Sequence, residues 1–264
     1  MRISQIIFSI IFFLITFFSF GQPKLYLDEN LKKIDSVTYS KKCKIHIFKC
    51  LEYHTDSLSV EKVLHKFYFG KVSQTEANQI TGLLALDSGK KIKKNDIIVL
   101  KYIDSLYNYK TSKRNYDKHV EKHKKFHHKR YNKKKYNKHK IKWEKTNYKC
   151  VKKFEKTEKI KVLHSVKHTQ NDLNNYRNIV VVKDRSVLKN TFFKIIYNYN
   201  LLILKPNGDY FLSGACLNDK KLLKLLKSDD WSVFRNDLKR SIDGNHENGF
   251  GFFKKLSYHK KHCF

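Results

Sequence analysis

The chain has five cysteines, and these are the first residues whose chemistry matters: Cys43, Cys50, Cys150, Cys216 and Cys263. In an oxidising compartment cysteines pair, so one thiol is left over, and each choice of free thiol allows three pairings of the other four. Cys43 and Cys50 lie seven residues apart on a predicted strand, which would separate them by roughly 23 Å. We therefore expect no direct bond between these two.

Cys216 is the predicted free thiol, which makes Cys43, Cys50, Cys150 and Cys263 the disulfide candidates. It stands just before a predicted helix, where the helix dipole makes a thiol more reactive. No neighbouring base can be identified, so an inert thiol or an intermolecular bridge is the interpretation we favour.

Three histidines recur at every fourth position: His119, His123 and His127. On a helix they would share one face, and this spacing suits two imidazoles that bind one metal ion. Four lysines surround the row and would repel a cation, namely Lys118, Lys122, Lys124 and Lys125. A solvated basic face is therefore the favoured interpretation, and we expect no cofactor.

A basic, aromatic segment extends over about residues 105–158. From Lys110 to Lys145 it contains 16 Lys or Arg residues against three acidic ones, with no Pro or Gly, so a long helix or helical hairpin is expected. Such a segment suits polyanions: single-stranded nucleic acid, lipid headgroups or acidic polysaccharide. It is equally an exposed insertion without a ligand. The candidate polyanion-binding residues are Lys124, Lys125, Lys129, Arg130, Lys133, Lys134 and Lys135.

The formal net charge of the whole chain is +32. Only seven of the 56 basic residues are Arg, and Lys, Asn, Ile, Phe and Tyr are all written by A/T-rich codons, so an A/T-rich genome would give this composition without selection for a basic protein. Sequence-specific nucleic-acid recognition favours Arg, so we expect no specific nucleic-acid partner. The usual hydrolase, phosphate-loop and dinucleotide motifs are missing, and we assign no catalytic residue.

Residues 1–21 have the pattern of a secretory signal peptide. Arg2 precedes an apolar run from Ile6 to Phe20, and Ser19 and Gly21 place small residues before a cleavage site at Gln22. The alternative is a retained membrane anchor, although the run falls slightly short of the length needed. We therefore expect a soluble exported protein, periplasmic or secreted, with no transmembrane span after cleavage.

Periodicity predicts an α/β protein in three segments after the signal: 22–104 of mixed strand and helix, 105–158 the basic helical insertion, and 159–264 of alternating elements. In the first, Cys43–Leu51, Val60–Val72 and Asp96–Tyr102 are the predicted strands. Ser73 and Glu76 form a capping box, which opens a helix closed at Gly89. In the third, strands are predicted over 159–168 and 179–182, a short helix over 185–193, and two helices over about 219–242.

The stretch from Leu201 to Leu226 resembles the second half of a thioredoxin fold. It contains, in order, an apolar strand, the turn Pro206-Asn207-Gly208, a second strand, the loop Gly214-Ala215-Cys216-Leu217 and a leucine-rich helix. The resemblance implies a thioredoxin-like C-terminal half carrying the basic insertion. Redox-active members carry Cys-x-x-Cys and a cis-proline; the first is absent here, and Tyr199 stands at the place of the second. The family's dithiol chemistry is therefore not expected.

As a whole the chain resembles uncharacterised exported bacterial proteins, which implies no function. We expect a non-enzymatic envelope or secreted protein that binds an anionic envelope surface or an acidic polysaccharide. The alternative is a degenerate thiol-redox protein that acts through Cys216. The sequence gives no indication of protein partners.

Overall fold

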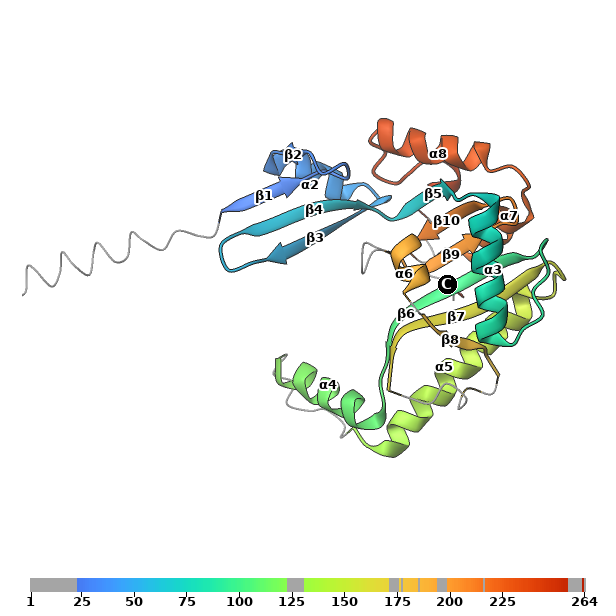
Figure 1. Cartoon of the computed structure of the whole chain (residues 1–264). Coiled ribbons are helices and arrows are strands. Elements are labelled where there is room, and N and C mark those ends of the chain that lie inside the picture. The colour runs from blue at the N-terminus through green and yellow to red at the C-terminus, as the bar shows by residue number, and fades with distance from the viewer. Residues whose placement is uncertain are drawn as a thin grey trace, which may run out of the picture.

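The computed structural model describes residues 23–122, 131–170, 176, 178–184, 186–193, 199–215, 217–255 and 263. Within them the chain is a mixed α/β protein with two β-sheets (Figure 1). No helix among the described residues is long and apolar enough to cross a bilayer. The predicted signal at 1–21 lies outside the described residues.

The smaller sheet is formed by the N-terminal strands. Its order is β2-β1-β4-β3, with bounds Lys33–Ile34, Lys24–Leu27, Ser59–His65 and Phe48–His54. Helix α2 (Ser36–Lys44) packs against it, and the Asp35 carboxylate caps this helix by accepting from the backbone N–H groups of Val37 and Thr38. The predicted strand over Cys43–Leu51 is therefore wrong in its first half, because α2 continues to Lys44.

The larger sheet has the order β5-β10-β9-β6-β7-β8. The bounds are Phe67–Lys71, Asp209–Ser213, Leu201–Leu204, Ile97–Leu106, Ile160–Thr169 and Val181–Lys183. Strands β6, β7 and β8 run parallel, whereas β9 pairs antiparallel with both β6 and β10. The hairpin predicted around Pro206-Asn207-Gly208 is confirmed, with Gly208 at φ 85° and its N–H bonded to the Lys205 carbonyl.

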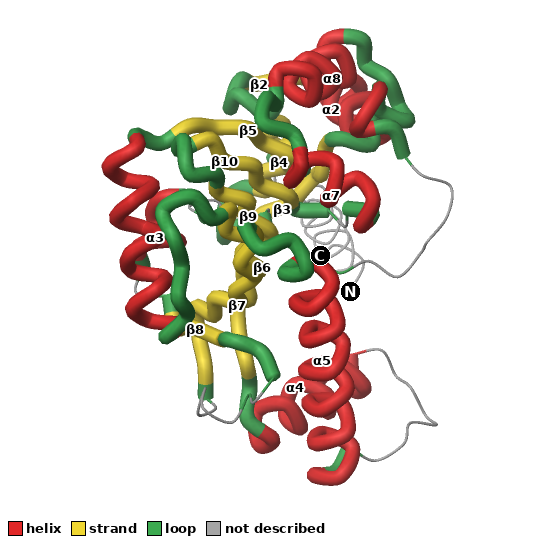
Figure 2. Tube along the Cα trace, turned by 90° about the vertical axis from the view of Figure 1, so that its right-hand side faces the viewer, coloured by secondary structure: helices red, strands yellow, loops and turns green. Residues whose placement is uncertain are grey.

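Helices cover both faces of the larger sheet (Figure 2). Helix α3 (Gln74–Ser88) begins with the predicted capping box, and it covers one face together with α6 (Val187–Thr191). On the other face lie α5 (Lys133–Phe154), α7 (Asp219–Lys227), α8 (Ser232–Asp243) and the short 3-10 helix η2 (Gly251–Phe253). Helix α4 (Tyr109–Lys122) extends from the end of β6, away from the sheet.

One core joins the two sheets. Ile47, Phe48 and Val63 lie in or next to the small sheet. They share a buried cluster with Phe211 of β10 and Leu222 of α7, which belong to the large sheet and its covering helices. Each such side chain contributes roughly 1.5–3 kcal/mol when fully buried, so the sheets are held together by apolar packing. Helix α5 is fixed to this core by its inner face.

Candidate anion-binding face of helix α5

The inner face of α5 fixes the orientation of the helix. Asn147, Cys150, Val151 and Phe154 are buried there, and Trp143 packs its ring against Tyr176 with centroids 5.6 Å apart. These positions recur at helical spacing, so the opposite side of α5 must face solvent.

Six lysines follow the outer face at intervals of three or four residues, and all are exposed: Lys134, Lys138, Lys142, Lys145, Lys149 and Lys152. We call this row the lysine stripe. At 1.5 Å per residue it extends for about 27 Å along the helix. Like charges at this spacing repel each other by a few tenths of a kcal/mol per pair, so the stripe costs stability rather than adding it.

Within the part of the chain that the structure describes, the stripe has no local counter-charge. The one acidic residue of α5, Glu144, lies off the row, and its Oε1 accepts from the backbone N and Nδ2 of Asn178 at 2.9 and 3.0 Å. Among the described residues, Lys138, Lys142, Lys145 and Lys149 form no ion pair with a carboxylate. A row of like charges without neutralising partners attracts anions.

The aromatic residues of the insertion serve another purpose. Tyr131 is buried between α4 and α5, where its ring stacks on Tyr116 at 4.9 Å and lies 6.5 Å from Tyr109. Lys135 Nζ lies 4.8 Å from the centre of the Tyr116 ring, and Tyr136 Oη donates to the Tyr107 carbonyl at 3.0 Å. These rings hold the helical hairpin together.

Of the predicted polyanion-binding residues, Lys133, Lys134 and Lys135 lie in the first turn of α5, the first two exposed and the third partly covered by tyrosines. Lys124, Lys125, Lys129 and Arg130 lie outside the described residues. The sequence analysis did not name the stripe lysines beyond Lys135, although their spacing of three or four residues can be recognised in the sequence.

Of the predicted metal row, only His119 is described, and it is exposed on α4. His123 and His127 lie outside the described residues. In the part of the chain that the structure describes, no three His, Cys, Asp or Glu side chains are grouped as metal ligands.

The structure pairs Cys43 with Cys50 and Cys150 with Cys263. The expectation that the first two do not bond is wrong. Cys43 lies in the last turn of α2 and Cys50 lies on β3, so the chain reverses between them and their Cα atoms are 5.7 Å apart. The two bonds use four of the five cysteines; Cys216 itself lies outside the described residues.

A buried polar group beneath α5 was missed by the sequence analysis. His164 of β7 and Lys101 of β6 lie side by side in register, and both contact the Asn147 amide oxygen: His164 Nε2 at 3.1 Å and Lys101 Nζ at 3.2 Å. Burial, together with the charges of Lys101 and Lys90, lowers the pKa of His164 to about 3, so the imidazole is neutral. Its Nδ1 has no hydrogen-bond partner among the described residues. The available signal was a histidine on the same strand face as Ile160 and Val162.

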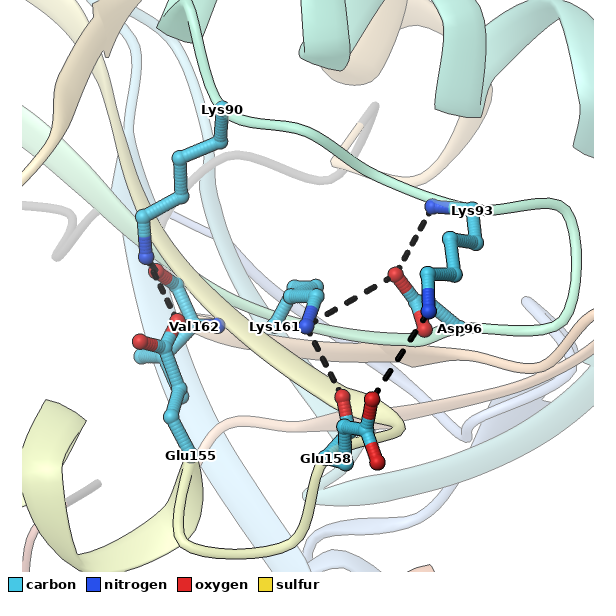
Figure 3. A network of polar contacts seen from close by, with 7 residues as sticks. All are labelled: Lys90, Lys93, Asp96, Glu155, Glu158, Lys161 and Val162. Atoms are coloured by element: carbon cyan, nitrogen blue, oxygen red, sulfur yellow. Dashed lines mark hydrogen bonds and ion pairs between the residues drawn. The ribbon is translucent and has the colours of Figure 1, made fainter.

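A second polar group lies where β6 and β7 begin, at the C-terminal end of α5 (Figure 3). Lys90 Nζ contacts Glu155 Oε1 at 2.5 Å, and the same oxygen accepts from the Val162 N–H at 2.8 Å. Lys161 donates to the Glu158 carbonyl at 2.8 Å and lies 3.8 Å from Asp96. These contacts attach the loops that precede the two strands to each other.

Comparison of the chain with protein-family models, with curated proteins and with solved structures finds no match.

Proposed function

We propose that this chain is an exported, non-enzymatic binding protein whose lysine stripe on α5 attaches it to a polyanionic surface. The observation that carries this proposal is the row of exposed lysines, which have no counter-carboxylates among the described residues and are held outward by the buried face of the same helix. The tyrosines pack within the helical hairpin, which favours charge attraction over base stacking. An anionic envelope surface or an acidic polysaccharide fits this attraction.

Export is proposed on two grounds. Two disulfides are typical of proteins that fold in an oxidising compartment, and the first 21 residues have the pattern of a signal peptide. A surface outside the cytoplasm is then the available polyanion.

The test is retention on immobilised heparin. In one variant, five stripe lysines are changed to Gln: Lys134, Lys138, Lys142, Lys145 and Lys149. In the control, five exposed lysines elsewhere are changed, so the net charge is the same: Lys33, Lys44, Lys91, Lys94 and Lys239. By the scaling measured for nucleic acids, losing five contacts lowers the slope of log affinity against log salt by roughly four.

We expect the stripe variant to elute at much lower salt than the wild type, and the control to elute close to the wild type. Equal elution of the two variants would show that net charge alone causes retention and would remove the proposal.

We propose further that the C-terminal half, together with β6 and α5 before it, is thioredoxin-like. The supporting features are the strand order β7-β6-β9-β10, the reversal of direction at β9, and helices α5 and α7 on one face with α6 on the other. In that arrangement α5 belongs to the fold itself, and α4 is the basic element added before it.

A second candidate function is single-thiol redox chemistry at Cys216. It is favoured by the pairing of the other four cysteines with each other, which leaves this thiol as the fifth. We expect one cysteine, Cys216, to be alkylated in the folded, non-reduced protein at neutral pH. If the peptide map finds Cys216 in a disulfide, this candidate is excluded.

A further inference from the structure

An open cleft of about 630 Å³ lies at the C-terminal end of the lysine stripe. One wall is the end of α5 from Tyr148 onward, continued by Glu155 and Lys156, and the other is the segment 178–180 that leads into β8. A volume of this size is within the range of sites that hold small molecules.

The floor of the cleft is apolar. Val151 and Ile179 line it and are almost fully buried, at 8% and 5% exposure, and Val180 continues the surface. The Tyr148 ring forms part of the wall. An apolar surface of this kind gains free energy when an apolar body displaces water from it.

The rim of the cleft carries an uncompensated positive charge. Glu155 is the acidic residue of the lining, and its carboxylate is already occupied by Lys90 and the Val162 N–H (Figure 3). Lys152 lies 5.0 Å from the centre of the Tyr148 ring, and Lys156 is exposed beside it. Neither lysine pairs with a carboxylate within the described residues. Two cations therefore face the opening above an apolar floor.

We infer that this cleft binds a small amphipathic anion: an apolar body of one or two rings, seated on Val151 and Ile179, with one acidic group held by Lys152 and Lys156. The site overlaps the lysine stripe at Lys152 and otherwise uses different residues. A neutral ligand leaves the lysines without a partner, and a compact inorganic anion leaves the floor uncovered.

The probe for this inference is 8-anilino-1-naphthalenesulfonate, and its matched control is N-phenyl-1-naphthylamine, the same ring system without the acidic group. We expect the sulfonate to bind at one saturable site with enhanced emission, and the uncharged twin to bind at least about tenfold more weakly.

Changing Lys152 and Lys156 together to Gln should weaken sulfonate binding by roughly tenfold. Both side chains are exposed, so the fold is not at risk. Changing Lys145 and Lys149 to Gln removes the same charge from the same helix outside the cleft, and should change the affinity by less than about twofold.

Three results would overturn the inference: no saturable binding, equal affinity for the charged and uncharged probes, or equal losses in the two double variants. Because the heparin variant leaves Lys152 and Lys156 unchanged, either proposal can fail while the other survives.

Discussion

His164 combines burial with an incomplete set of hydrogen bonds. Its Nε2 contacts the amide oxygen of Asn147, and Lys101 Nζ contacts the same oxygen. A proton added to Nδ1 would place a second cation beside Lys101 in the protein interior, at a site 1% exposed. The folded protein therefore excludes that proton, whereas the unfolded chain accepts it.

This difference predicts how stability depends on pH. The pKa of His164 is about 3 in the folded state against an ordinary value of 6.5, so between these values the unfolded chain binds the extra proton and stability falls as pH falls. From pH 7 to pH 5 the contribution is about 2 kcal/mol of unfolding free energy. Urea unfolding of the wild type and of His164→Gln, each at pH 7 and at pH 5, measures this contribution.

His168→Gln is the matched control, because His168 lies exposed on the same strand. His46, whose pKa is lowered to about 4 by burial and by Lys66, Lys255 and Lys221, keeps part of the acid sensitivity in every variant. The same loss between pH 7 and pH 5 in His164→Gln as in the wild type would contradict the prediction.

At the scale of elements, the two disulfides join different kinds of neighbour. Cys43–Cys50 links α2 to the strand that follows it, across seven residues, whereas Cys150–Cys263 links α5 to a residue 113 positions later. Constraint of the unfolded chain grows with the length of the closed loop.

We therefore expect replacing both cysteines of a pair with Ser to cost about 2.5 kcal/mol for Cys43–Cys50 and nearly 5 kcal/mol for Cys150–Cys263. Urea unfolding at neutral pH, with Cys216 blocked in all samples, gives both values. A larger loss at Cys43–Cys50 would show that strain or residual structure, rather than loop length, sets the difference.

Elements with local signals were predictable. The Ser73 capping box and the Pro206-Asn207-Gly208 turn both depend on contacts within a few residues, and both are confirmed. Helix α2 was missed because Cys43, Ile45 and Ile47 alternate like a strand, although Asp35 offered a cap signal. The Cys43–Cys50 bond was misjudged for the same reason.

The pairing of strands that lie far apart in the sequence could not be predicted from local sequence signals. Strand β5 precedes α3 in sequence but pairs with β10, and β9 lies between β10 and β6. The register that places Lys101 next to His164 depends on this arrangement, as does the cleft between α5 and residues 178–180. Neither the buried polar group nor the cleft could be predicted from the sequence alone.

For the molecule as a whole, total charge is a poor guide to function. Lysines occur on most elements, and many are engaged: Lys205 Nζ donates to the carbonyls of Ser228 and Asp229, and Lys66 Nζ donates to that of His46. What distinguishes α5 is arrangement, since its outer lysines lie in one line without carboxylates between them.

The Cys150–Cys263 bond also makes a covalent ring of the chain between these residues. A protease that cuts once inside this ring opens it without separating any fragment, so the nicked protein keeps its mass, apart from one added water, until a reductant is present. Gel analysis of limited proteolysis without reductant would therefore show an intact band for a chain already cut in its longest stretch.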